Sequence, residues 1–314
     1  MPVELLLALG LGLAVVSMLS WLVVAFNRAK GARMALLDAE SEIAQTAAGP
    51  VEYALLGDAG PVVLFLHGSP GGYDNAEPLD NGFRTLAPSR PGYLRTPLEV
   101  GATASEQAAA MAALLDQLEI DQVIVFAVSG GGPAGLCFAA DFPERTVALV
   151  AAEAVSGATP LPKMPSFPGL DFLLWVIGRA VWATVGSRGL IRMMIPDPAN
   201  RAKLLEDPKG LERFNALFAG VWPLEPRVAG ANNDSVQFAG LELPLERIVA
   251  PTLVIHGTAD INVPYAHGQR IADQIPGARL HTIDGGDHMM PFTHAAEFER
   301  VLTAFLEYAL TLTE

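Results

Sequence analysis

Ser129 follows an apolar run and lies between residues with very small side chains. The run Val123-Ile-Val-Phe-Ala127-Val leads into Ser129, and Gly130-Gly131-Gly-Pro continues the chain. A serine on a sharp turn between a strand and a helix is exposed for attack on a carbonyl group. Such a turn closes only if the positions two before and two after the serine carry almost no side chain. Ala127 and Gly131 meet this requirement, so the pattern predicts that Ser129 is a nucleophile.

An acid and a histidine follow the serine along the chain. Asp260 ends the segment Leu253-Val-Ile-His256-Gly-Thr-Ala, and His288 follows Gly285-Gly-Asp287. Because a serine hydroxyl is a weak nucleophile, we predict that His288 takes its proton as general base and later returns it as general acid. Asp260 is predicted to orient the imidazole. Glu153 and Asp287 are alternatives for the acid, and Asp260 is preferred because it directly follows a predicted strand.

These segments resemble the α/β-hydrolase fold, in its esterase- and lipase-like serine hydrolase branch. The order serine, acid, histidine is the order in that family, and the resemblance runs from about Glu52 to the end of the chain. It is weakest between about Ser156 and Arg247. Ala127 departs from the family pattern, in which glycine is commoner, but a methyl group is the smallest addition.

Two further loops carry the resemblance. His67-Gly-Ser69-Pro-Gly-Gly follows an apolar run, and in the family this loop supplies half of the oxyanion hole. By position, the resemblance implies that the backbone N–H groups of Ser69 and Gly130 bind the oxyanion. The segment Ser89-Arg-Pro-Gly-Tyr93 matches the loop after the fourth strand of many members.

The resemblance implies hydrolysis of carboxylic esters or thioesters through an acyl-enzyme, with a small acyl substrate that has an apolar portion. The same triad could serve a peptidase, a carbon–carbon bond hydrolase, a transacylase or a perhydrolase. A non-catalytic binding protein on this fold is a second alternative, because the fold alone does not establish activity. We expect no metal or other cofactor, since no spacing of His, Cys or carboxylate residues indicates a metal site. The sequence carries no signal for an oligomeric state.

The N-terminal segment is apolar, whereas the chain as a whole is acidic. Leu5 to Phe26 contains no charged residue, and as a helix it would be about 33 Å long, enough to cross a bilayer core. We predict a single-pass membrane anchor. Arg28, Lys30 and Arg33 follow it and favour a cytoplasmic catalytic domain. The alternative is a signal segment that is cleaved to give a secreted or periplasmic enzyme. The formal charge of −14 argues against binding to nucleic acid.

Apolar runs and helical periodicities alternate along the rest of the chain and predict a mostly parallel, doubly wound sheet. An antiparallel hairpin is expected over 41–46 and 51–57, with its turn at Gly49-Pro50. Helices are expected after the Thr103-Ala-Ser-Glu106 capping box and over about 294–312. Further strands are expected over 62–66, 83–87, 123–127, 147–152, 252–255 and 278–283.

This pattern divides the chain into an anchor with a basic flank (1–33), a hydrolase core (34–155 and 248–314) and a helical cap (156–247) inserted after the sixth strand. The cap is rich in proline and in large apolar residues. We expect some of these residues to line an apolar acyl pocket. The candidates are Trp175, Trp182, Met193, Phe218 and Met289, together with Phe172, Met194 and Trp222.

Overall fold

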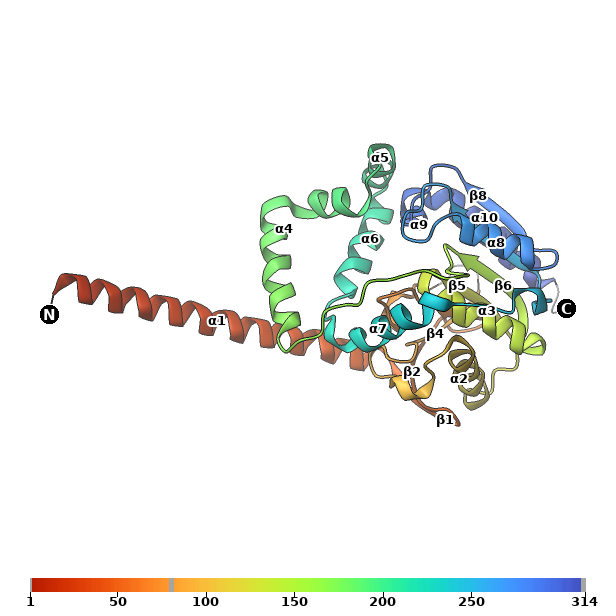
Figure 1. Ribbon diagram of the computed structural model, residues 1–314, viewed down its shortest axis with the longest axis horizontal. Coiled ribbons are helices and arrows are strands. Elements are labelled where there is room, and N and C mark those ends of the chain that lie inside the picture. Colours follow the sequence, from red (N-terminus) through yellow and green to blue (C-terminus); the bar gives the residue numbers. More distant parts are fainter. Residues whose placement is uncertain (1, 79–81, 312–314) are drawn as a thin grey trace.

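A single long helix, α1 (Val3–Ala39), projects from a body that is built around a sheet (Figure 1). The computed structural model describes residues 2–78 and 82–311. The strands are β1 (Glu42–Thr46), β2 (Gly49–Leu56), β3 (Val62–Leu66), β4 (Arg84–Pro88), β5 (Val123–Val128), β6 (Thr146–Ala152), β7 (Thr252–Gly257) and β8 (Arg279–Ile283). The other helices are α2 (Ala104–Gln117), α3 (Gly132–Asp141), α4 (Leu170–Met194), α5 (Pro198–Glu206), α6 (Pro208–Gly220), α7 (Val228–Gln237), α8 (Ala266–Gln274), α9 (Met290–Thr293) and α10 (Ala295–Leu310).

Within the described residues, eight strands form one sheet in the order β1-β2-β4-β3-β5-β6-β7-β8. The pairs β1–β2 and β2–β4 are antiparallel, and the remaining neighbours are parallel. The mostly parallel sheet is therefore confirmed. The predicted turn at Gly49-Pro50 is wrong, because Gly49 pairs with Thr46 and Pro50 with Gln45, and the turn lies at Ala47-Ala48. Pro50 lies near the start of β2, before the pairing of β2 with β4 begins at Tyr53, so its missing N–H removes no hydrogen bond to β4.

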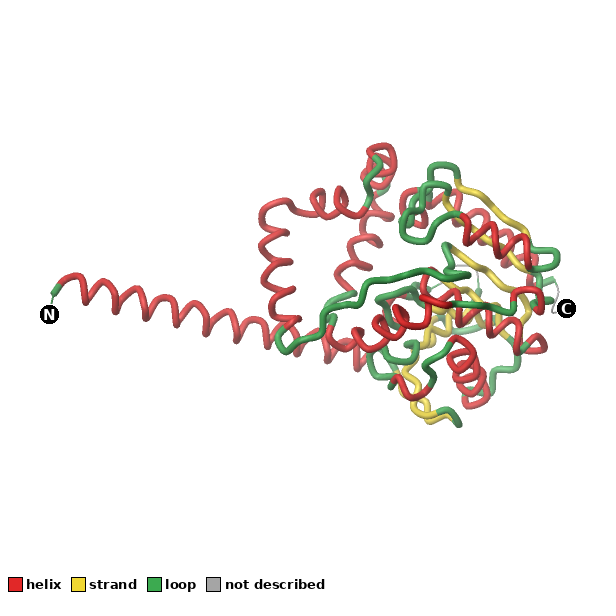
Figure 2. The backbone as a smooth tube through the Cα atoms, in the orientation of Figure 1, coloured by secondary structure: helices red, strands yellow, loops and turns green. Residues whose placement is uncertain are grey.

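Helices cover both faces of the sheet, as Figure 2 shows. Alternate residues of a strand point to opposite faces. In β3, Leu64 and Leu66 join an apolar cluster with residues of α2 and α3, whereas Val63 joins a second cluster with residues of α10. The inner parallel strands β3, β5, β6 and β7 are thus buried on both sides, which explains why they appear in the sequence as continuous apolar runs, whereas β8 at the edge is partly exposed.

Both predicted helix signals correspond to helices. The Thr103 side chain accepts a hydrogen bond from the N–H of Glu106, and the Glu106 carboxylate accepts one from the N–H of Thr103, so the capping box is formed at the start of α2. The last helix, α10, begins at Ala295, one residue after its predicted start. The predicted end of this helix at Leu312 lies outside the described residues.

A helical insertion lies between β6 and β7 and comprises α4, α5, α6 and α7. Two of its prolines begin helices rather than interrupt them. Pro198 and Pro208 occupy the first turn of α5 and α6, where their missing N–H costs nothing. The carboxylates of Asp197 and Asp207 cap these helices by accepting backbone N–H bonds.

The helix α1 passes without interruption through residue 33, the predicted boundary between anchor and core. Its last turns belong to the body, since Leu37 is buried with Ala54, Tyr73 and Ala87. Among the described residues, α1 and α4 are the helices that are long and apolar enough to cross a membrane by length and composition.

Candidate active site

Ser129 lies on a strained turn between β5 and α3. Its φ of 51° is in the left-handed region, which non-glycine residues rarely adopt. A side chain on Gly131 would put its Cβ 2.2 Å from the carbonyl oxygen of Leu66, so only glycine fits there. The methyl group of Ala127 fits because Gly135, one turn into α3, has no side chain. A Cβ on Gly135 would lie 2.5 Å from that methyl group.

Three side chains that follow three different parallel strands meet at one edge of the sheet. His288 Nε2 lies 3.1 Å from Ser129 Oγ, and His288 Nδ1 lies 2.7 Å from Asp260 Oδ2. Ser129 follows β5, Asp260 follows β7, and His288 lies between β8 and α9. In parallel sheets the carboxyl ends of the strands gather at one edge, which is where ligands bind. The structure thus brings together the three residues predicted from separate motifs.

Backbone hydrogen bonds hold the Asp260 carboxylate in place. Its Oδ1 accepts bonds of 2.9 Å from the N–H groups of Asn262 and Val263, so Oδ2 is left for His288. His256 supports the same loop by donating from Nε2 to the carbonyl oxygen of Val263. His256 thus fixes the backbone of the loop that carries Asp260.

The surroundings of His288 favour its charged form. Burial lowers the pKa of the imidazole, but the carboxyl groups of Glu153 and Asp260 outweigh that effect, and the net pKa lies above its usual value of 6.5. Because Glu153 is mainly protonated at neutral pH, the hydrogen bond to Asp260 is the cause that raises the pKa of His288 there. A general base that gains a proton needs this support, because the resulting imidazolium is largely enclosed by protein.

Glu153, one of the alternatives for the acid, lies close to the same histidine, but its burial changes its protonation. It directly follows β6, has a φ of 50° and is 2% exposed. Burial raises its pKa to about 8, and the nearby Asp260 and Asp287 carboxylates also raise it. Its Oε1 atom has no hydrogen-bond partner among the described residues. Glu153 is therefore mainly a neutral acid at pH 7, whereas Asp260 has the direct contact with His288.

Asp287, the other alternative, turns away from the serine. Its two carboxylate oxygens accept bonds from the side-chain amide of Asn200 on α5 and from the N–H of Met289. The residue joins the insertion to the loop that carries His288, and no bond in the described part of the chain links it to Ser129.

The loop predicted to contribute to an oxyanion hole lies against the serine turn. A Cβ on Gly68 would lie 3.2 Å from the Cβ of Ser129, and a Cβ on Gly130 would lie 3.2 Å from the backbone nitrogen of Ser69. The backbone segments that carry the two predicted donors are thus in contact. This close approach explains why both positions are glycine.

A buried polar cluster supports this loop from behind. Arg90 makes a two-pronged ion pair with Asp234 on α7, with bonds of 2.7 and 3.1 Å, and it donates to the carbonyl oxygen of His67. The hydroxyl of Tyr93 donates to Asp234 and is 2.8 Å from Ser69 Oγ. Sequence reasoning missed Asp234, because a single acid in a helix carries no motif.

His67 completes the cluster as a neutral imidazole. Its Nε2 accepts the N–H of Arg90, and its Nδ1 donates to the carbonyl oxygen of Gly68. Burial lowers its pKa well below 6.5, and the charge of Arg90 lowers it further. The ring therefore fixes the position of the loop.

The five predicted pocket residues do not lie together. The Trp175 ring packs against Phe26 of α1 at 5.9 Å, and Trp182 and Met193 are 58% and 69% exposed. Phe218 and Met289 share one apolar cluster with Ile191, Ile195, Leu204 and Phe214. Met289 directly follows His288, so this cluster reaches the catalytic edge of the sheet. Phe172 and Trp222, also considered for the pocket, likewise pack against Phe26, whereas Met194 borders the cluster.

Comparison with known proteins supports the same fold. A family profile described as the alpha/beta hydrolase fold matches residues 61–295. An uncharacterized hydrolase of Bacillus subtilis (strain 168) is 30% identical over 275 residues, which cover 82% of this chain and 95% of the relative. The 2-hydroxy-6-oxononadienedioate/2-hydroxy-6-oxononatrienedioate hydrolase 1 of Pseudomonas putida is 28% identical over 269 residues, which cover 82% and 92%.

Among solved structures, an alpha/beta hydrolase fold protein from Nakamurella multipartita matches with a TM-score of 0.73 and 33% identity, covering 83% of this chain and 97% of that protein. The profile match includes β3 to β8 and the loops that carry Ser129, Asp260 and His288. The chain belongs to the α/β-hydrolase fold family, and it is a hydrolase.

Proposed function

We propose that the protein hydrolyses carboxylic esters or thioesters through an acyl-enzyme on Ser129. The observation that carries the proposal is the position of His288, with one ring nitrogen 3.1 Å from Ser129 Oγ and the other 2.7 Å from Asp260 Oδ2. A base within hydrogen-bond reach of the nucleophile, itself oriented by a third group, is the arrangement that acyl transfer by serine requires.

The reaction has two halves. Ser129 Oγ attacks the carbonyl carbon while His288 Nε2 takes the hydroxyl proton, and the N–H groups of Ser69 and Gly130 donate to the developing oxyanion. Loss of one such donor typically costs about 3–4 kcal/mol of barrier. The bond to the alcohol or thiol then breaks, and the leaving group takes the proton from Nε2. Water next attacks the acyl-enzyme and gives a proton to Nε2, and Nε2 returns this proton to Ser129 Oγ as the bond to the acyl group breaks and the acid is released.

The substrate is proposed to carry a neutral, apolar acyl portion. Phe218 and Met289 border an apolar cluster that extends to the residue next to His288, so a hydrocarbon chain placed there would replace water at an apolar surface. These two residues remain our candidates for the pocket. Trp175, Trp182 and Met193 are set aside because they face α1 or solvent.

Hydrolysis of a carbon–carbon bond is the second candidate, because the Pseudomonas putida relative is named for a dienedioate substrate. Such a substrate has two carboxylates and would need unpaired cations beside the serine. The two fully buried arginines, Arg90 and Arg227, are already paired with Asp234 and Asp74. We therefore place the ester first.

We also propose that α1 anchors the enzyme as an uncleaved single-pass helix, with the catalytic domain on the cytoplasmic side. The end of α1 is part of the folded body: Phe26 packs on Trp175, and Arg33 pairs with Asp74. Removal of α1 as a signal segment would break these contacts. The basic residues after the apolar segment favour the cytoplasmic orientation.

A substrate panel tests the proposed chemistry. The detergent-solubilised full chain is offered nitrophenyl esters and a thioester of increasing acyl length, aminoacyl amides, and a 2-hydroxy-6-oxo-dienedioate. We expect the highest kcat/KM with an apolar acyl ester and a loss of at least about 10³-fold in Ser129→Ala. Ser156→Ala is the matched control, because Ser156 also contacts a histidine, His267, outside the proposed triad. Turnover confined to amides or to the dienedioate would contradict the ester assignment.

A further inference from the structure

The first part of α4 is an apolar helix that the rest of the molecule leaves uncovered. All nine residues from 177 to 185 are exposed, and Arg179 is the single charged residue among them. The large apolar side chains among them are Ile177, Val181 and Val185, which are four residues apart and share one face, and Trp182 beside them. An apolar face of a helix is normally buried in a core or in lipid. Something outside this chain must therefore cover α4.

The start of α4 lies where the uncharged segment of α1 ends. Phe26 is the last residue of that segment. Its ring packs edge-on against the Phe172 ring, with 5.2 Å between the ring centroids. One turn later in α1, Lys30 pairs with Asp171 at 2.8 Å and with Glu225 at 2.6 Å. If α1 spans a bilayer through Phe26, as proposed above, the first turn of α4 lies at the boundary between lipid and water.

From that point α4 runs crosswise to α1. Figures 1 and 2 show its first part extending away from the α1 axis rather than along it. A helix that runs across a membrane-spanning helix lies parallel to the membrane plane. Gly186, with a φ of 61°, interrupts the helix, and the second part turns back toward the body. Ile191 in this second part belongs to the apolar cluster that includes Met289, next to His288.

The charge of this segment differs from that of the whole chain. Residues 172–196 contain Arg179, Arg188 and Arg192 and no acidic residue, although the chain has a formal charge of −14. All three arginines are exposed. Arginine side chains beside apolar and tryptophan residues are typical of helices that lie at the surface of anionic membranes. Arg179 lies over the Trp175 ring at 5.1 Å, so its charge is held near one end of the apolar stretch.

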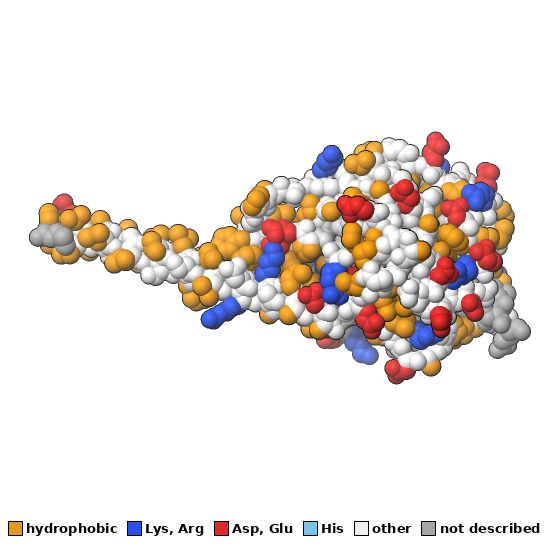
Figure 3. All heavy atoms as spheres, turned by 90° about the horizontal axis from the view of Figure 1, so that it is seen from below, with side chains coloured by type: hydrophobic (Ala, Val, Ile, Leu, Met, Phe, Trp, Pro, Cys, Tyr) orange, Lys and Arg blue, Asp and Glu red, His pale blue; other side chains and the backbone are white. Residues whose placement is uncertain are grey.

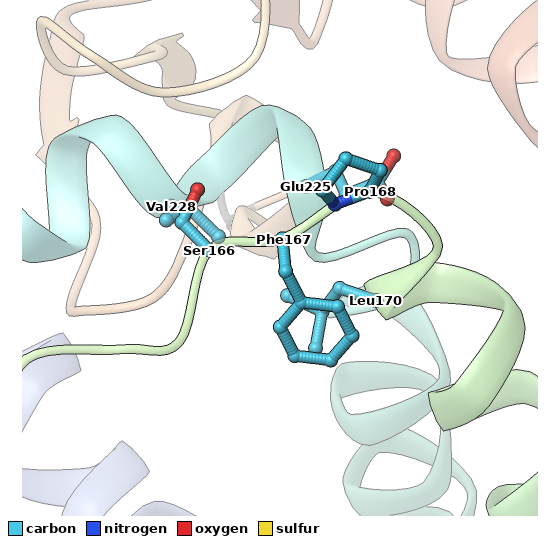
Figure 4. A pocket seen from close by; sticks show the side chains of 6 residues that line it. All are labelled: Ser166, Phe167, Pro168, Leu170, Glu225 and Val228. Carbon is cyan, nitrogen blue, oxygen red and sulfur yellow. The ribbon is translucent and has the colours of Figure 1, made fainter.

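A further large apolar side chain, Phe167, is exposed at the base of α4. A hollow of about 350 Å³ lies there, lined by Ser166, Phe167, Pro168, Leu170, Glu225 and Val228. Figure 4 shows Phe167 and Leu170 side by side, at the segment that leads into α4. Figure 3 shows hydrophobic side chains along α1 and over the end of the body that α1 joins.

We propose that residues 170–185 lie along the surface of the same bilayer that α1 spans, and that the enzyme takes its apolar acyl substrate from that bilayer. The proposal rests on the membrane anchoring proposed above. The bilayer is favoured over a second copy of this chain because α4 continues the apolar surface of α1, and because the charged residue of 170–185 that is not in an ion pair, Arg179, is basic and suits anionic headgroups. The second part of α4 then links lipid to the apolar cluster beside His288.

Fluorescence quenching by lipid tests this placement. The full chain with Cys137→Ala receives one cysteine, at Val181→Cys or at Val249→Cys, and an NBD fluorophore is attached to it. Val249, which is 72% exposed, precedes β7 and so lies at the edge of the sheet opposite to His288. The protein is reconstituted into phosphatidylcholine vesicles with a minor fraction of phosphatidylserine, and the phospholipids carry bromine at a shallow or a deep acyl position.

We expect the label at 181 to emit at shorter wavelength and to be quenched more by shallow than by deep bromine, and the label at 249 to show neither effect. Equal, water-like emission at both sites would overturn the proposal. Stronger quenching by deep bromine would mean that α4 spans the bilayer, and self-quenching that disappears on dilution with unlabelled protein would mean a second copy. Either result contradicts the surface placement.

A kinetic comparison separates this placement from the catalytic proposal. Val181→Asp combined with Val185→Asp should lower hydrolysis of a long-chain ester held in vesicles several-fold, with hydrolysis of a soluble short-chain ester unchanged. Val249→Asp should change neither rate. An equal loss on both esters would overturn the role of α4. If alkaline carbonate releases the wild-type chain from vesicles while soluble-ester hydrolysis persists, the anchoring and the α4 placement fail but the catalytic proposal does not.

Discussion

The proposed chemistry depends at the residue scale on how His288 holds a proton. Its Nδ1 faces the Asp260 carboxylate at 2.7 Å, and its pKa is raised above 6.5 even though burial alone would lower it. The imidazole must be neutral to accept the Ser129 proton. At the acid end of the pH range, activity therefore depends on the pKa of His288.

We predict that kcat/KM for a soluble ester rises with pH along an acid limb whose apparent pKa is above 6.5. In Asp260→Asn the limb should move to lower pH and the plateau should fall by orders of magnitude, because the imidazolium loses its partner. Glu153→Gln is the matched variant, since Glu153 is mainly protonated at pH 7 with a pKa raised by burial to about 8. It should move the acid limb much less than Asp260→Asn does, because Glu153 carries little charge at the pH of the limb. An acid limb that moves with Glu153→Gln and stays with Asp260→Asn would reverse the assignment of the two acids.

At the scale of elements, the serine turn depends on how closely α3 approaches β5. The Ala127 methyl group occupies the space that a side chain at Gly135 would need, since a Cβ there would lie 2.5 Å from it. Glycine within a helix normally costs stability relative to alanine, by about 1 kcal/mol. Here the contact between the two elements outweighs helix propensity.

Gly135→Ala should therefore destabilise the protein, by about 1–3 kcal/mol as is typical of an overpacked core. The double variant Ala127→Gly with Gly135→Ala should recover most of that loss, because the methyl group has moved from one element to the other. Thermal unfolding of the detergent-solubilised full chain measures both. If the losses of stability from the two substitutions simply add, with no recovery in the double variant, the contact does not control the turn.

At the scale of the whole molecule, local patterns predicted what depends on local sequence. Ser129, Asp260 and His288 each carry a motif of a few residues, and the sheet places the ends of their strands at one edge, so the three side chains meet. The capping box at Thr103 was predictable for the same reason. Its two hydrogen bonds join residues that are three positions apart.

Features that depend on how elements pack were missed. Trp175 and Trp182 are large and apolar, but nothing in the sequence indicates that one faces α1 and the other solvent. The pairing of Arg90 with Asp234 joins residues 144 positions apart, and no motif marks the acid. The boundary at residue 33 was inferred from the end of an apolar segment, whereas Leu37 is buried because the helix continues into the body.

Labelling with a fluorophosphonate is the most direct test of the central claim that Ser129 is an acylated nucleophile activated by His288. The reagent reacts preferentially with activated serines, and peptide mass spectrometry locates the adduct. We predict one adduct, on the peptide that contains Ser129, which is absent in Ser129→Ala, strongly slowed in His288→Ala, and unchanged in Ser156→Ala. Equal labelling of the wild type and Ser129→Ala would contradict the account.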